Sequence, residues 1–241
     1  MKPAVLAFAL AGAFGGSIPS FAMENGEHGG QLFHVVRAEL DATDTQWLDR
    51  NDGALFTWDA SAWYGGDREK LWLRSEGEIL AGDIEQAEFW ALYSRNIAEF
   101  WDFQAGLRYD FEPGNTAYLA IGFEGLATYF FETGAHAFVS ENGDISARLA
   151  QSIDILITQR LIAEPHAELN LYAGDVPELG VGAGASDIEL GLQTRYEITR
   201  QFAPYLDLVY ERALGETAGI ARAAGGDPES VTLRLGLRVW F

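Results

Sequence analysis

The sequence predicts an all-β protein, a transmembrane antiparallel up-and-down β-barrel of about 12 strands. Three observations support this. Apolar and polar residues alternate along many segments, no long apolar run follows the N-terminal segment, and long and short connections alternate. Alternation with a period of two places the apolar side chains on one face of a strand. In a closed barrel that face meets lipid, and every backbone N–H and C=O finds a partner.

The clearest predicted strand lies at 231–241, where Val, Leu and Phe at odd positions alternate with Thr, Arg, Gly and Trp at even positions. We expect about a dozen such segments, near 31–42, 54–64, 69–80, 85–95, 99–111, 116–127, 130–140, 145–158, 160–173, 187–199, 202–214 and 230–241. Most reach the roughly 9 to 11 residues that a tilted strand needs to cross a bilayer. Their number is even, as in bacterial outer-membrane barrels.

The connections differ in length. Long ones are expected at 43–53, 174–187 and 215–230, and short ones at 94–98, 158–159 and 199–201. Outer-membrane barrels have short periplasmic turns and longer extracellular loops. With both ends of the barrel domain in the periplasm, the long connections therefore lie outside the cell.

The N-terminal residues read as a secretory signal peptide. Lys2 precedes an apolar stretch at 4–16, and Ser20 and Ala22 form the small-x-small ending of a cleavage site. We therefore expect a signal peptide at 1–22, a short periplasmic segment at 23–31 and an outer-membrane barrel at 32–241. The apolar stretch is shorter than the roughly 20 residues of a spanning helix.

The chain is strongly acidic, with 36 Asp and Glu against 16 Lys and Arg and a formal net charge of −20. Binding to nucleic acid depends on clustered Lys and Arg, so nucleic acid is excluded as a partner. The acidity has two explanations, soluble extracellular loops or attraction of cations. Absence of cysteine says little about the redox compartment.

If the apolar positions face lipid, the barrel lumen is rich in charge. The residues expected there include Glu76, Glu88, Arg148, Glu189 and Asp207. Carboxylates outnumber arginines on this face. Ion pairs that brace and fill a narrow barrel explain the pattern, and so does a cation pathway, since rings of Asp and Glu select cations in pores.

Metal ligands are few. Imidazole suits copper, zinc and nickel, whereas thioether suits Cu(I). We expect His136 with Glu132 on one strand, and His166 between Glu164 and Glu168 on another, to be the best candidates for a luminal site. The remaining candidate ligands are His34, His28 and Met23. A histidine beside carboxylates also occurs as a hydrogen-bonded structural residue, so each cluster has that alternative.

Motifs typical of enzymes are not found. The chain has no nucleophile elbow, His-Glu-x-x-His, Walker loop or dinucleotide fingerprint. We therefore expect a protein that is not an enzyme.

Several segments resemble the copper resistance protein B family of outer-membrane proteins. The resemblance covers about 33–241, and its most specific pieces are 63–67, 70–78, 122–127, 159–161, 168–172, 189–192, 195–198, 202–205 and 237–241. Many family members carry a long N-terminal tract rich in Met and His, whereas the corresponding region here is 23–31. The resemblance therefore does not imply high-capacity copper binding by a tail.

The resemblance implies a copper resistance and homeostasis protein in the outer membrane of a Gram-negative cell. Such a protein would bind copper ions, conduct them across the membrane, and work beside a periplasmic multicopper oxidase. Three alternatives stay open on the residues themselves. They are a general small-cation channel, a closed barrel that stabilises the envelope, and a soluble periplasmic β-sandwich.

Overall fold

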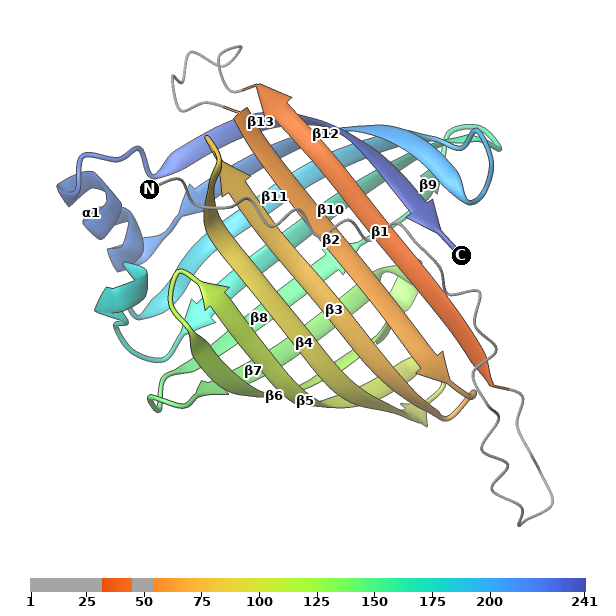
Figure 1. The fold of residues 1–241 in the computed structure, drawn as a ribbon, viewed down its shortest axis with the longest axis horizontal. Coiled ribbons are helices and arrows are strands. Elements are labelled where there is room, and N and C mark those ends of the chain that lie inside the picture. Colours follow the sequence, from red (N-terminus) through yellow and green to blue (C-terminus); the bar gives the residue numbers. More distant parts are fainter. Residues whose placement is uncertain (1–31, 45–53) are drawn as a thin grey trace, which may run out of the picture. The chain divides into compact units, whose positions relative to one another are not determined.

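The computed structural model describes residues 32–44 and 54–241. The expected signal peptide at 1–22 and the expected segment at 23–31, with Met23 and His28, lie outside the described residues. The described residues are almost entirely strand (Figure 1). No described helix is long and apolar enough to cross a membrane.

The strands run in chain order around one sheet. Their bounds are β1 Phe33–Asp44, β2 Ala54–Gly65, β3 Glu69–Leu80, β4 Asp83–Ala98, β5 Trp101–Glu112, β6 Thr116–Leu126, β7 Glu132–Ser140, β8 Ile145–Ser152, β9 Ile155–Leu156, β10 Leu161–Tyr172, β11 Gly184–Tyr196, β12 Phe202–Ala213 and β13 Glu229–Trp240. The helix α1 spans Gly215–Ala223, and 3-10 turns span Thr128–Phe130 and Pro177–Leu179.

The sheet closes on itself because the first and last strands pair. β1 pairs antiparallel with β13, so that Leu40 lies opposite Leu237, and β10 pairs with β11 on one edge and with β8 on the other. In the described residues twelve strands form this ring, and the two-residue β9 adds to β10 beside the end of β8. A closed antiparallel barrel of twelve strands confirms the predicted fold class.

The outward face is apolar. In β13 the exposed side chains are at odd positions, from Val231 through Leu235 to Leu237, and Leu235 is 65% exposed. Leu107 of β5 and Leu119 of β6 are also exposed, at 58% and 63%. An exposed apolar band of this kind is the lipid-facing surface of a transmembrane barrel.

One expected strand is shorter than predicted. The segment expected at 145–158 is divided into β8, which ends at Ser152, and the two-residue β9 at Ile155–Leu156, and between them Asp154 forms an ion pair with Arg195. The connection between β8 and β10 is therefore longer than the two residues expected at 158–159.

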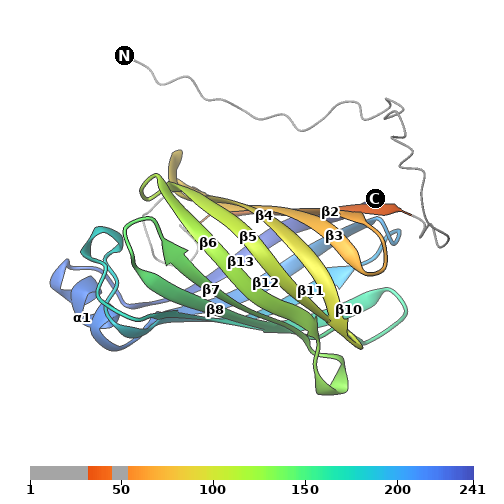
Figure 2. The same cartoon turned by 90° about the horizontal axis from the view of Figure 1, so that it is seen from below.

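The long connections at 173–183 and 214–228 lie at the end of the barrel away from Phe241, where α1 is seen in Figure 2. The backbone N–H of Gly182 donates to Thr217 Oγ1 of α1 over 3.0 Å, which joins the two connections. The long connections thus share one end of the barrel, in agreement with the alternation in the sequence.

The lumen is not purely polar. Trp90, Leu92, Tyr118 and Phe138 form a buried cluster with Ala120, and Trp72 packs against it. Trp90 and Leu92 share their strand face with the buried Glu88, so they point inward. Glu88 lies in the lumen as expected from strand parity, and the apolar side chains of the same parity face inward with it.

Candidate functional site

The lumen has two differently lined parts. The inward side chains of β4 to β7 form what we call the filled side, where Glu88 and His136 are buried around Trp90. We call the wall formed by β10, β11 and β12 the acidic side. Its carboxylates Glu168, Glu189 and Glu211 have side chains that are 32%, 31% and 43% exposed. Glu168 and Glu211 also pair with Arg148 and Arg234, so Glu189 is the member of this set without an arginine partner among the described ion pairs.

His136 belongs to the filled side. Its Nε2 lies 2.9 Å from Oε1 of Gln104, and its ring packs edge-on against Trp90 with 5.4 Å between centroids. Glu132 lies at the exposed start of β7, and no described contact joins it to His136. The geometry matches the hydrogen-bonded structural role that was the alternative for this histidine.

His166 of β10 lies on the acidic side. Its Nε2 is 3.5 Å from Oε1 of Glu189 and 3.8 Å from Oδ2 of Asp207. The ring lies across Gly191 of β11, where an added Cβ would be 2.0 Å from Nε2. Because Gly191 has no side chain, the imidazole reaches past β11 to Asp207 on β12.

Asp207 is 6% exposed, and its Oδ1 has no hydrogen-bond partner among the described residues. A buried carboxylate oxygen without a partner costs free energy. It is therefore an oxygen beside His166 that a water molecule or an ion could satisfy.

Glu164 and Glu168 flank His166 in sequence but are engaged by arginines. Glu164 forms ion pairs with Arg195 and, at 2.8 Å, with Arg238. Glu168 lies 3.2 Å from Arg148. The carboxylates that actually approach His166 are Glu189 and Asp207, which sequence reasoning placed in the lumen without assigning them to this histidine. Their approach follows from strand register, and the glycine at a luminal position of β11 was the available signal.

The other histidine candidates do not join this group. His34 lies opposite Tyr64 and shares the outward face of β1 with Val36 and Leu40, so it is exposed outside the lumen. His28 and Met23 lie outside the described residues.

The donor set near His166 is one imidazole nitrogen and several carboxylate oxygens. Nitrogen and oxygen donors suit Cu(II), whereas Cu(I) prefers sulfur. Among the described residues no group of three or more His, Asp and Glu side chains is arranged as a formed metal centre. The ligand types therefore fit a copper ion, but their spacing is that of a loose contact site.

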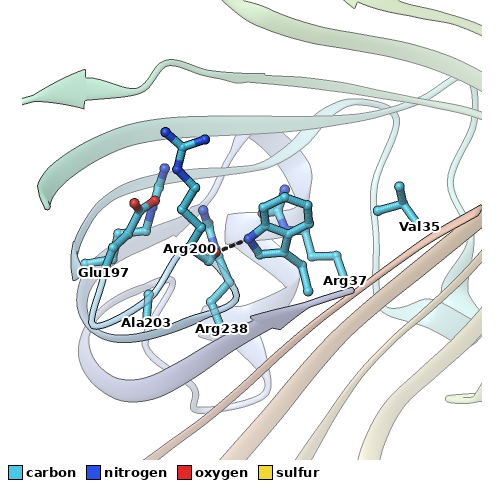
Figure 3. Close-up of a pocket in the computed structure, with 8 residues that line it drawn as sticks. Val35, Arg37, Glu197, Arg200, Ala203 and Arg238 are labelled. Atoms are coloured by element: carbon cyan, nitrogen blue, oxygen red, sulfur yellow. Dashed lines mark hydrogen bonds between the residues drawn. The ribbon is translucent and has the colours of Figure 1, made fainter. Parts of the chain in front are cut away.

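A cavity of about 220 Å³, whose lining Figure 3 shows, lies near the chain end, where Phe241 pairs through its backbone with Val36. It is lined by Val35, Arg37, Arg195, Glu197, Arg200, Ala203, Arg238 and Trp240. Its arginines are largely neutralised, since Arg195 and Arg238 both hold Glu164 and Arg37 lies 2.5 Å from Glu39. Trp240 donates its indole N–H to the carbonyl oxygen of Arg200, shown dashed in Figure 3. Ion pairs and this hydrogen bond thus hold the walls of the cavity together.

The family model described as copper resistance protein B precursor matches residues 36–241. A copper resistance protein B homolog from Pseudomonas syringae pv. tomato is 42% identical over 217 residues, which are 89% of this chain and 74% of the relative. Copper resistance protein B from Escherichia coli is 40% identical over 197 residues, 81% of this chain and 67% of the relative. These matches confirm the resemblance seen in the sequence.

Solved structures agree on the fold. The NanC porin has a TM-score of 0.54 at 13% identity, and the KdgM porin has 0.51 at 10%. Each likeness covers 86% of this chain and 99% of the porin, and it concerns the fold alone. A closed antiparallel barrel with an apolar outer face belongs in a bacterial outer membrane, which confirms the expected location. The chain is a member of the copper resistance protein B family.

Proposed function

We propose that this barrel confers copper resistance by binding copper ions on the acidic side of its lumen and conducting them across the outer membrane. The observation that carries the proposal is the position of His166 beside Glu189 and the unpartnered Oδ1 of Asp207. The family membership supports copper as the ion, and the accessible carboxylates support its passage.

The chemistry of the acidic side suits transient binding. A net-negative, water-accessible wall raises the local concentration of cations. Conduction requires a site that binds strongly enough to admit the ion and weakly enough to release it. One imidazole and two carboxylates, whose oxygens lie 3.5 Å and 3.8 Å from Nε2 of His166, supply donors of the type suited to transient contact with Cu(II).

The proposal includes two accompanying features. The protein acts without catalysis and delivers or removes copper beside a periplasmic multicopper oxidase, as the family resemblance implies. Its N-terminal residues 1–22 direct export, and 23–31 precede the barrel in the periplasm. Sequencing the N-terminus of the mature protein tests the export signal, which predicts Met23 as the first residue.

The test is complementation of a strain from which the gene has been deleted. Wild-type protein should restore growth on copper, and His166→Ala should restore less. His136→Gln, which changes the packed histidine of the filled side, is the matched control and should restore growth fully. Copper tolerance that does not change when the gene is deleted would overturn the proposal.

A general small-cation channel is the second candidate function, and a specific observation favours it. The acidic side carries partly exposed carboxylates besides those near His166, and although Glu168 and Glu211 also pair with arginines, the excess negative charge of this wall attracts any small cation. In planar bilayers this alternative expects equal passage of Cu²⁺ and Mg²⁺ through the wild type and through His166→Ala.

A further inference from the structure

Arg148 of β8 reaches across the lumen to the opposite wall. Its Nη1 lies 3.1 Å from Oε2 of Glu76 on β3 and 2.9 Å from Oε1 of Glu88 on β4. The strands β4 to β7 lie between β3 and β8 in the ring. Among the described ion pairs, the Arg148 and Glu76 pair joins strands that are farthest apart around the barrel.

The same guanidinium is also held from its own side. Its Nε lies 3.2 Å from Oε1 of Glu168 on the neighbouring strand β10. On the opposite wall its charge also lies 5.4 Å from the ring centroid of Trp90 on β4. Charge-assisted bonds to several carboxylates fix both the position and the direction of an arginine. Arg148 is only 11% exposed, whereas Glu76 and Glu168 are 30% and 32% exposed.

This arrangement places Arg148 at the border of the two parts of the lumen. On one side it touches Glu88 and Trp90, which are buried in the filled side. On the other it touches Glu76 and Glu168, whose side chains are 30% and 32% exposed. A fixed guanidinium between these carboxylates occupies space in the lumen and offsets part of their negative charge.

We propose that Arg148 is a cross-bar that sets the bore of the lumen and limits its preference for cations. The inference rests on the proposed function in one respect only, namely that ions pass through the lumen. It does not depend on copper, because the cross-bar acts on every ion that passes the acidic side.

Arg234 provides a matched control. It is a luminal arginine of similar burial, 13% exposed, and it pairs with Glu211 at 2.8 Å. Glu211 and Arg234 belong to the neighbouring strands β12 and β13, so this pair stays on one wall. Removing Arg234 also removes one positive charge from the lumen but leaves the cross-bar in place.

The experiment measures single-channel currents of the full chain in planar bilayers with a KCl gradient. Arg148→Ala should raise the unitary conductance and shift the reversal potential toward the value for potassium. Arg148→Met, which keeps the length but not the charge, should shift the reversal potential with little rise in conductance. Arg234→Ala should keep the conductance of the wild type.

The results of these recordings support or overturn the proposed role of Arg148. If the wild type shows no openings, Arg148→Ala should create them. The proposal is overturned if Arg148→Ala and Arg148→Met both behave as the wild type, or if Arg234→Ala gives the same rise in conductance. Where Arg148→Ala does not insert, Arg148→Met carries the test by its reversal potential. Copper tolerance has no part in these measurements, so a failure of the copper proposal and a failure of the cross-bar are separate results.

Discussion

Substitution of Gly191 by Ala tests whether His166 binds copper, and it does so without replacing any of the proposed ligands. The new Cβ would lie 2.0 Å from Nε2 and 2.1 Å from Cε1 of His166, and the three nearest atoms all belong to that ring. Because ordinary contacts between such atoms need about 3.5 Å, the imidazole must move by about 1.5 Å. That displacement is large compared with the gaps of 3.5 Å and 3.8 Å to Glu189 and Asp207.

The expected loss of affinity follows from the role of the ring. Changing a residue that orients a metal ligand typically costs roughly 10- to 100-fold in affinity. The strand itself should tolerate the change, since Gly191 lies within β11 without a left-handed backbone and Ala suits a strand better than Gly. We therefore expect Gly191→Ala to fold normally and to bind Cu(II) as weakly as His166→Ala.

The assay is titration of Cu(II) into detergent-solubilised barrel, followed by calorimetry and by electron paramagnetic resonance for nitrogen coordination. Gly134→Ala is the control, because its Cβ would lie 3.8 Å from Cε1 of His136, an ordinary contact. It should bind copper as the wild type does. Wild-type affinity in Gly191→Ala would refute the reasoning, since the ring would then have no part in binding.

The remaining predictions concern the lumen and the outer face. Glu88→Gln should destabilise the barrel by about 3 kcal/mol in urea titration, because Glu88 is 0% exposed and pairs with two arginines. Glu211→Gln, whose carboxylate is 43% exposed, should cost less than about 1 kcal/mol in the same assay. Trp90→Ala should cost about 3 to 5 kcal/mol, since it empties the centre of the filled side. Leu107→Arg should cost about 2 to 4 kcal/mol in unfolding from lipid, because Leu107 faces outward near the middle of β5.

Strand identity and strand face were readable from the sequence wherever alternation was strict. The segment at 231–241 is the clearest case, and β13 occupies Glu229–Trp240 with the expected residues outward. In β4 the run Phe89, Trp90, Ala91, Leu92 is apolar on both faces, so period-two reasoning had no means of recognising the filled side.

The ion-pair partners of the luminal side chains could not be predicted from the sequence, for a different reason. Spacing along one strand placed Glu164 and Glu168 beside His166, but contacts inside a barrel join strands that are far apart in the chain. Glu168 forms an ion pair with Arg148, and Glu164 forms ion pairs with Arg195 and Arg238. Such pairings depend on the register and curvature of the closed sheet, which alternation alone does not encode.

Carboxylates of one chemical type thus have two roles in this lumen, and burial separates them. Glu88 is wholly buried between arginines, so its charge is neutralised and braces the filled side. Glu189 and Glu211 have side chains that are 31% and 43% exposed, so under the proposed function cations can reach them. Arginines pair with buried carboxylates, as Arg148 does with Glu88, and with exposed ones, as Arg234 does with Glu211. Because 36 acidic residues outnumber 16 basic ones, the chain keeps a net charge of −20 that attracts cations. Arg148 touches carboxylates of both kinds, and this is why its removal should change conduction as well as stability.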